Sequence, residues 1–174
     1  NPGEFVSALE SPSAAANLLA ADVAFVAYYG KRTAEFVSGY VSLKRQIQPI
    51  VEEVLGAAAQ RIKQLDRNAV VGFRGSAARG YKGPHKGNDP FDPENFDVDG
   101  FIVSDKLAAE IPRTRGARFV TQRSSPALAT EQQLVDEQLR AKLPGLKSQP
   151  FTFRVFTFEE YLSKANDGRF VGGE

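Results

Sequence analysis

The sequence predicts an α+β protein in which a helical N-terminal portion, residues 1–66, packs on an α/β core, residues 67–174, as one compact domain. Apolar residues recur at helical spacing in the N-terminal portion. Short runs rich in β-branched and aromatic residues then alternate with helical patterns, as expected for a small mixed sheet with packed helices. With 174 residues, 42% of them hydrophobic, the chain is long enough for a substantial core.

Two helical segments are predicted in the N-terminal portion. The apolar stretch 14–29 is interrupted by Asp22 and follows no basic segment, so we expect a core helix and no membrane span or signal peptide. A second apolar stripe at helical spacing covers residues 31–65. Because Pro49 has no amide hydrogen and crowds the preceding turn, we expect a break or kink near Gln48.

The core is expected to begin with a buried strand, a tight turn and a helix. After a Gly- and Pro-rich loop at 81–94, segments with strand-like and helix-like patterns alternate. The expected elements are strands at 70–74, 96–103, 118–122 and 151–158, helices from 77, at 105–111, at 130–143 and from 159, and a loose tail at 171–174. The strand at 151–158 has the densest set of β-forming residues.

Two aspartates stand two residues apart in the expected strand 96–103. Side chains two apart on a strand share a face, so Asp97 and Asp99 should project together while Val98 is buried behind them. Two adjacent carboxylates repel one another, and a divalent cation allows both to stay ionised. Magnesium takes oxygen ligands from one or two carboxylates and from substrate phosphates. The pair therefore predicts a metal site and a phosphorylated partner.

The turn at Gly75-Ser76 has the features of a phosphate site. The first amides of a helix are unpaired and attract anions. Gly75 allows close approach of the backbone, and Ser76 can cap the helix or donate its hydroxyl. Arg74 and Arg79 can add charge-assisted hydrogen bonds.

Gly75-Ser76 followed by Asp97-Val98-Asp99-Gly100 resembles the nucleotidyltransferase superfamily typified by DNA polymerase beta. The family pattern is a hydrophobic residue, Gly, Gly or Ser, and later Asp, a hydrophobic residue, and Asp or Glu. The resemblance, over residues 70–103, implies a mixed sheet of nucleotidyltransferase type and two magnesium ions bound by Asp97 and Asp99. It also implies that Ser76 contacts the phosphates of a nucleoside triphosphate (NTP) such as ATP.

Two features depart from that family. The distance from Gly75-Ser76 to Asp97 is longer than usual, which requires residues 81–94 to be an inserted loop. A third carboxylate, which the family carries on a later strand, has no clear counterpart in 151–157. Glu159 and Glu160 lie just beyond that strand and are poor candidates.

The predicted reaction is magnesium-dependent transfer of a nucleoside monophosphate from an NTP to a hydroxyl of RNA or protein, with release of pyrophosphate. Asp97, Asp99 and Ser76 are the expected catalytic residues, and Arg74, Arg79 or Lys82 would neutralise phosphate charge. We expect Arg154 either to contact substrate phosphate or to pair with a carboxylate of the sheet.

Other functions remain open at this point. A related pyrophosphokinase would use the same residues, and a non-catalytic module could bind nucleotide. Residues 89–99 are dense in oxygen donors and could bind calcium, although two prolines stiffen them and the spacing is not that of an EF-hand. A ribonuclease would need acid–base groups that are not evident, since His85, the single histidine, is expected to be merely exposed in its loop.

Charge and composition give further expectations. The net charge of +1 indicates no general affinity for nucleic acid. Basic residues are nonetheless concentrated at 113–118, at Arg123 and at Lys82 and Lys86. They form either a solvated face or an electrostatic track for a polyanionic acceptor such as RNA. The absence of cysteine excludes disulfides within the sequence.

No methionine occurs in the sequence, which suggests a piece of a longer protein. In general organisation the chain resembles the C-terminal effector domain of a bacterial polymorphic toxin. That resemblance implies secretion, an RNA or protein acceptor in the cytoplasm of a target cell, and a small inhibitory (immunity) protein as partner.

Overall fold

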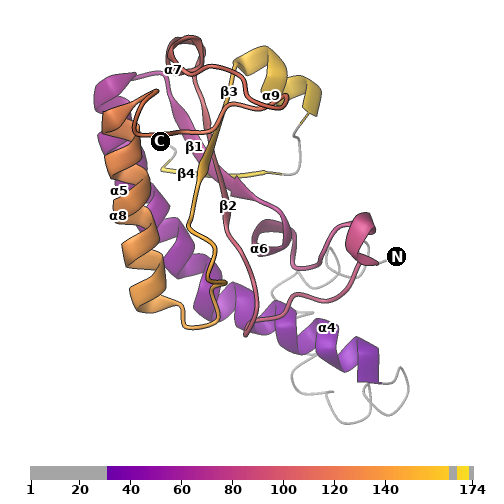
Figure 1. Ribbon diagram of the computed structural model, residues 1–174. Helices are drawn as coiled ribbons and strands as arrows, with labels where there is room; N and C mark the ends of the chain where they lie inside the picture. Colours follow the sequence, from indigo (N-terminus) through magenta and orange to yellow (C-terminus); the bar gives the residue numbers. More distant parts are fainter. Residues whose placement is uncertain (1–30, 165–167, 173–174) are drawn as a thin grey trace.

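The computed structural model describes residues 31–164 and 168–172. A long helical segment leads into a four-stranded mixed sheet with strand order β3-β2-β1-β4 (Figure 1). β1 is antiparallel to both β2 and β4, whereas β2 is parallel to β3. The strands are β1 Val70–Arg74, β2 Asp99–Val103, β3 Phe153–Phe156 and β4 Arg169–Val171. The predicted α+β class, with a helical N-terminal portion and a mixed sheet, is confirmed. The helix expected at 14–29 lies outside the described residues.

The long helical segment contains three parts that follow one another without a break. They are α4 Lys31–Ser42, a π-helical turn η1 Leu43–Ile47, and α5 Gln48–Leu65. The amide of Gln48 donates to the carbonyl of Leu43, five residues earlier, and Pro49 lies in the first turn of α5. The predicted irregularity at Gln48 is therefore a π turn that directly precedes the proline, which has no amide hydrogen to donate.

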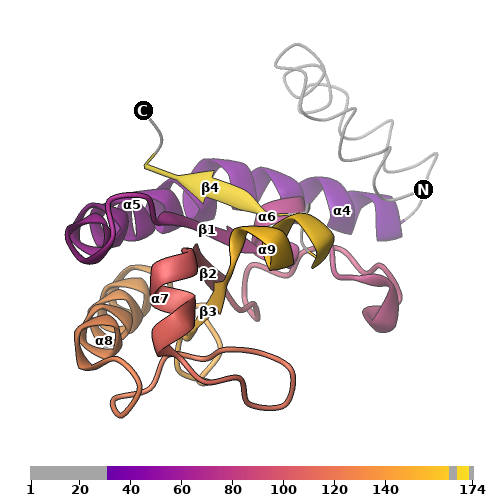
Figure 2. The same cartoon turned by 90° about the horizontal axis from the view of Figure 1, so that it is seen from above.

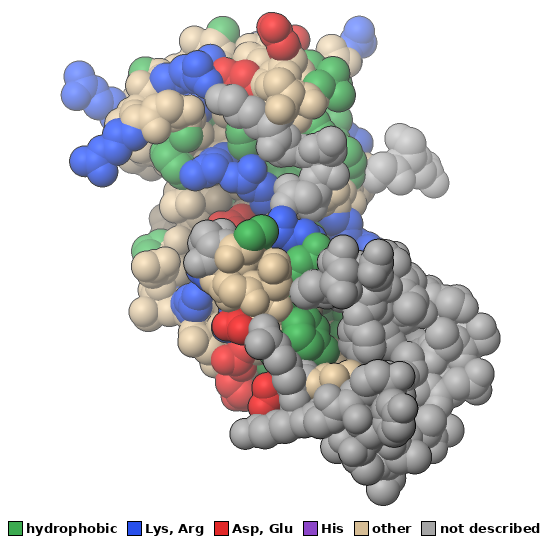
Figure 3. Space-filling view, turned by 90° about the vertical axis from the view of Figure 1, so that its right-hand side faces the viewer, with side chains coloured by type: hydrophobic (Ala, Val, Ile, Leu, Met, Phe, Trp, Pro, Cys, Tyr) green, Lys and Arg blue, Asp and Glu red, His purple; other side chains and the backbone are tan. Residues whose placement is uncertain are grey.

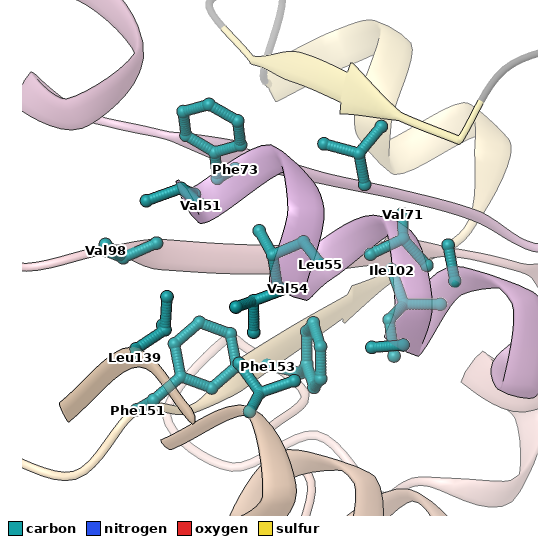
Figure 4. Close-up of a cluster of buried hydrophobic side chains, with 14 of the residues drawn as sticks. Val51, Val54, Leu55, Val71, Phe73, Val98, Ile102, Leu139, Phe151 and Phe153 are labelled. Atoms are coloured by element: carbon teal, nitrogen blue, oxygen red, sulfur yellow. The ribbon is translucent and has the colours of Figure 1, made fainter. Parts of the chain in front are cut away.

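Two helices cover one face of the sheet. α5 and α8 Pro126–Lys142 run side by side and lie on the same side of the strands (Figures 1 and 2). Each contributes apolar residues at helical spacing to a core that also includes the inner side chains of the strands. Figure 4 labels core residues from both helices and from the strands, among them Val51, Val54, Leu55, Leu139, Val71, Phe73, Ile102 and Phe153. Ile62 and Leu128 belong to the same core.

The opposite face of the sheet is divided between an apolar end and a charged end. At the apolar end, the ring of Phe101 stacks on Tyr161 of α9 Phe158–Lys164, with 5.2 Å between ring centroids. At the charged end, Arg74 is paired directly with Asp99 across β1 and β2. Directly opposed residues of neighbouring strands share a face, and Arg154 opposes Phe101 on the same face. The sheet therefore presents Arg74, Asp99 and Arg154 together.

Three predicted strands differ from the structure. β2 begins at Asp99, because Phe96 forms an isolated bridge with Leu146 instead of joining the sheet. The strand expected at 118–122 is wrong: Phe119 makes a single bridge to Arg154. The strand expected at 151–158 is confirmed only over its central part, 153–156.

Three helices and the C-terminal segment complete the fold. α6 Ser76–Arg79 follows β1, α7 Asp105–Glu110 follows β2, and the 3₁₀ turn η2 Pro84–Lys86 lies in the inserted loop. α8 begins at Pro126, four residues before the expected start. The loose tail expected from Val171 is wrong at that residue, because residues 169–171 pair with β1 as an edge strand.

Candidate active site

A small cleft at the charged end of the sheet brings the predicted site residues together. Its volume is about 200 Å³, and we call it the carboxylate cleft. Its lining residues are Arg74, Gly75, Ser76, Arg79, Lys82, Gly83, Lys86, Asp97 and Asp99. Every residue proposed from the sequence is present except Arg154, which lines an adjacent groove. Residues far apart in the chain therefore meet at one place.

Alternation of side chains places both aspartates on the cleft side. Val98, between them, is only 6% exposed and belongs to the helix-covered core (Figure 4). Asp99 reaches solvent, yet the surrounding protein removes much of the water near its carboxylate. This burial, together with the charge of Asp97, raises the pKa of Asp99 above its ordinary value, and the nearby charges of Arg74, Arg154 and Lys86 oppose the rise.

The Gly75 turn lies directly against Asp99. Gly75 has a φ of +79°, in a region that side chains other than glycine rarely adopt. A Cβ atom at this position would lie 2.7 Å from Oδ2 of Asp99, which is closer than real contacts allow. Glycine is thus required here for two reasons: the backbone conformation, and the space that the Asp99 carboxylate occupies.

Ser76 lines the cleft and does not cap α6, which was one of the two roles expected for it. Gly75 is the N-cap residue of α6, and Ser76 is its first helical residue. The amides of Ala78 and Arg79 both donate to the Gly75 carbonyl, at 3.2 and 3.0 Å. Because α6 has only four residues, a helix dipole contributes little. Anion binding here would depend on the turn and on the surrounding cations.

Gln48 supports the turn from the long helical segment and was not predicted as a site residue. Its side chain is 2% exposed, and its Nε2 donates to the carbonyls of Ala77 (2.8 Å) and Ala78 (3.2 Å) in α6. The available signal was a glutamine within an apolar helical stripe next to a proline. This contact fixes α6, and with it Ser76, against α5.

The inserted loop, residues 81–94, folds back over the cleft. The amide of Lys82 donates to the carbonyl of Asp89 at 2.8 Å, and Phe91 is buried with its ring 5.2 Å from that of Phe96. The loop thereby adds Lys82 and Lys86 to the cleft. From the sequence, Lys86 was recognised only as one of several clustered basic residues and was not predicted to line the site. The backbone of His85 lies in η2, and its side chain is outside what the structure describes.

Lys147 is a second residue that the sequence did not indicate. Its Nζ lies 3.6 Å from Oδ2 of Asp97, and its amide donates to the carbonyl of Phe96 at 2.8 Å. It belongs to the loop after α8, so only the folded chain brings it to the aspartates. No local sequence pattern could have identified it.

No third carboxylate joins Asp97 and Asp99 in the lining of the cleft as the structure describes it. Glu160 instead accepts hydrogen bonds from Arg118 at 2.6 and 2.7 Å and pairs with Arg113 at 3.0 Å. Across residues 31–164 and 168–172, no three or more Asp, Glu, His or Cys side chains gather in a metal-binding arrangement. This includes the described acidic residues of the segment 89–99.

A larger hollow, of about 920 Å³, adjoins the cleft at Lys82 between α4 and the inserted loop. Glu35, Asp89 and Asp92 line it. Seen from the side of the inserted loop, Lys and Arg side chains cross the middle of the molecule and acidic side chains gather below them (Figure 3). The acidic hollow is unsuited to a phosphate, whereas the carboxylate cleft provides cations for one.

No protein-family model matches the chain, and comparisons with curated proteins and with solved structures find no significant match. Among the described helices, none combines the length and the apolar character needed to cross a membrane.

Proposed function

We propose that the protein is a magnesium-dependent nucleotidyltransferase that moves a nucleoside monophosphate from an NTP to a hydroxyl of RNA or protein. The observation that carries this proposal is the contact between the Gly75 turn and Asp99 within a cleft rich in cations. The sheet of nucleotidyltransferase type, the two magnesium ions and the toxin context with its inhibitory partner are parts of the same proposal.

The donor set of the cleft suits magnesium. Asp97 and Asp99 offer carboxylate oxygens on one side of the chain, and burial together with mutual repulsion makes a second negative charge unfavourable without a cation. Magnesium commonly binds one or two carboxylates and completes its shell with water and substrate phosphates. Asp97 and Asp99 would therefore hold the metal. When bound, it would polarise the phosphate oxygens and the attacking hydroxyl.

The remaining lining suits a chain of phosphates. Four cations, Arg74, Arg79, Lys82 and Lys86, surround the turn at Gly75-Ser76. The volume of about 200 Å³ is enough for phosphates but small for a whole nucleotide. Base and ribose would then extend beyond the carboxylate cleft.

In the proposed reaction, the acceptor oxygen forms a bond to the α-phosphorus while the bond from that phosphorus to the bridging oxygen of the β-phosphate breaks. Pyrophosphate leaves with the electron pair of the broken bond, and the hydroxyl proton passes to solvent. Lys82, Lys86 and Arg79 would stabilise the charge that develops on the leaving group. The amide and hydroxyl of Ser76 would hold a phosphate oxygen in position.

A non-catalytic nucleotide-binding module is the second candidate. It is favoured by one observation, namely that Asp97 and Asp99 are the only carboxylates among the described residues that line the cleft. Such a module would bind NTP and magnesium without turning them over.

Pyrophosphate release tests the proposal. The protein is incubated with magnesium, each NTP in turn and total cellular RNA or a cell lysate. We expect release with wild type and loss of it in an Asp97→Asn, Asp99→Asn double variant. An Asp89→Asn, Asp92→Asn double variant, which removes the same charge from the acidic hollow, serves as the matched control. Tight NTP binding without release in any mixture would favour the non-catalytic candidate.

A further inference from the structure

A second groove adjoins the carboxylate cleft and contains five arginines. It has a volume of about 460 Å³, and we call it the arginine groove. Its charged lining residues are Arg74, Arg113, Arg115, Arg118, Arg154 and Glu160. A single carboxylate thus faces five guanidinium groups. Glu160 is already engaged by Arg113 and Arg118, so the groove as a whole is strongly positive.

The arginine groove adjoins the carboxylate cleft at Arg74. Arg74 lines both and is paired directly with Asp99 across β1 and β2. Arg154 lies on the same sheet face, and its charge, like that of Arg74, stabilises the ionised form of Asp99. A chain-like anion in the groove would therefore end beside the aspartates.

Two guanidinium groups of the groove lie over aromatic rings. Arg154 is 5.2 Å from the centroid of Phe119, and Arg74 is 5.5 Å from that of Phe156. Phe119 is 36% exposed, so part of its ring faces solvent. Flat guanidinium and aromatic surfaces of this kind stack unpaired bases in proteins that bind single strands.

A strained turn supplies the outer edge of the groove. The backbones of Thr114 and Ala117 bond to each other, at 2.7 and 3.2 Å, and enclose Arg115 and Gly116. Arg115 has a φ of +53°, an unfavourable conformation for a residue with a side chain. Strain at a non-glycine residue is often found at functional sites, and here the residue is an exposed arginine in a positively charged lining.

From these features we propose that the arginine groove binds the phosphodiester backbone of a single-stranded polynucleotide, whose terminal hydroxyl is the acceptor in the carboxylate cleft. This inference rests on the proposed function. Guanidinium groups match phosphate oxygens with paired hydrogen bonds, and several of them along a groove match successive phosphates. An acidic polypeptide could pair with the arginines, but it has no bases to stack on the aromatic and guanidinium surfaces. The strand is single, because the bases along a duplex are stacked on one another and are not free to stack on Phe119 and Arg154.

Binding is tested by fluorescence anisotropy with short labelled RNA and DNA oligonucleotides, without NTP or magnesium. The test variant is Arg113→Gln, Arg115→Gln. The matched control is Arg67→Gln, Arg123→Gln, two exposed arginines outside the groove. We expect the test variant to bind roughly tenfold more weakly, and its salt slope to fall by about 1.4, since each single-strand phosphate contact contributes about 0.7. The control should bind nearly as wild type does.

Three results separate this inference from the proposed function. Strand binding by wild type and by the Asp97→Asn, Asp99→Asn variant, without pyrophosphate release, would support the groove and reject the transfer. Pyrophosphate release with a protein acceptor, without strand binding, would reject the groove alone. Equal displacement of the oligonucleotide by poly-glutamate of similar length would also overturn the inference, because the groove would then not distinguish a polynucleotide from an acidic polypeptide. The RNA and DNA probes show which sugar is preferred.

Discussion

Oδ2 of Asp99 occupies the space beside Gly75 in which any other residue would place its Cβ atom, with 2.7 Å between the two positions. The end of β1 and the beginning of β2 are thus fitted to one another at the point where phosphate and metal binding would meet. The turn and the carboxylate form a single structural unit.

Gly75→Ala should therefore damage both stability and function. We expect a loss of about 1–3 kcal/mol in the free energy of unfolding, because alanine is strained at this φ. We also expect the added Cβ atom to displace the carboxylate of Asp99. Chemical denaturation measures the first effect and magnesium titration the second. Gly56→Ala is the control: a Cβ there contacts nothing within 4 Å, and it should stabilise α5 by roughly 0.5–1 kcal/mol. Equal stability of the two variants would argue against the described turn.

Gln48→Leu should weaken the connection between α5 and α6. The substitution removes two hydrogen bonds to the carbonyls of Ala77 and Ala78, and we expect a loss of about 1–3 kcal/mol in urea unfolding. NTP binding should weaken as well, since the turn is no longer fixed. Gln64→Leu, at an exposed position of the same helix, should change stability by less than about 0.5 kcal/mol. If the Gln48→Leu variant binds NTP as tightly as wild type, Gln48 does not position the turn.

Glu160 should contribute stability that depends on pH. The hydrogen bonds from Arg118, and the charges of Arg118 and Arg113, hold the pKa of Glu160 below its ordinary value of 4.5, against the opposing effect of burial. Its contribution is therefore fully present above pH 4.5 and is lost as the pH falls through the lowered folded-state pKa. Glu160→Gln should be less stable than wild type by about 1–3 kcal/mol at neutral pH, and the difference should shrink in acid.

Thermal unfolding of Glu160→Gln across this pH range, beside an exposed-site Glu159→Gln control, measures the effect. A stability difference that does not change with pH would contradict the described ion pairs. A loss shared equally by both variants would point to the start of α9 and not to the arginines.

Lys147 should oppose cation binding at Asp97. Its ammonium group is 3.6 Å from Oδ2 of that residue, so it repels a cation there. Because a partly exposed pair is worth up to about 1 kcal/mol, we expect Lys147→Gln to tighten magnesium binding by up to about fivefold in isothermal titration. Lys142→Gln, whose partner is the distant Glu53, should bind as wild type does. Weaker magnesium binding by Lys147→Gln would show that the lysine supports the site.

The parts of the site that could be predicted from the sequence are those set by local geometry. The alternation of an extended chain was sufficient to place Asp97 and Asp99 on the side opposite to Val98, although β2 itself begins only at Asp99. The contacts of Gln48 and Lys147 depend on how distant elements pack. The glutamine within an apolar helical stripe was a local signal, but it did not indicate the partner, and Lys147 had no such signal. β4 has only three residues and forms by pairing with the edge of β1, so its own sequence does not predict it. The inserted loop could be recognised from its Gly and Pro residues, but its return over the cleft could not.

Nucleotidyl transfer by the carboxylate cleft is tested most directly by supplying magnesium, total cellular RNA or lysate, and NTP labelled either at the α-phosphate or at the γ-phosphate. We expect only the α-label to enter an acceptor, and we expect an Asp97→Asn, Asp99→Asn double variant that remains folded to transfer none. Transfer of the γ-label to a nucleotide would identify a pyrophosphokinase. Absence of transfer of either label by a protein that binds NTP and magnesium would contradict the catalytic role assigned to the aspartates.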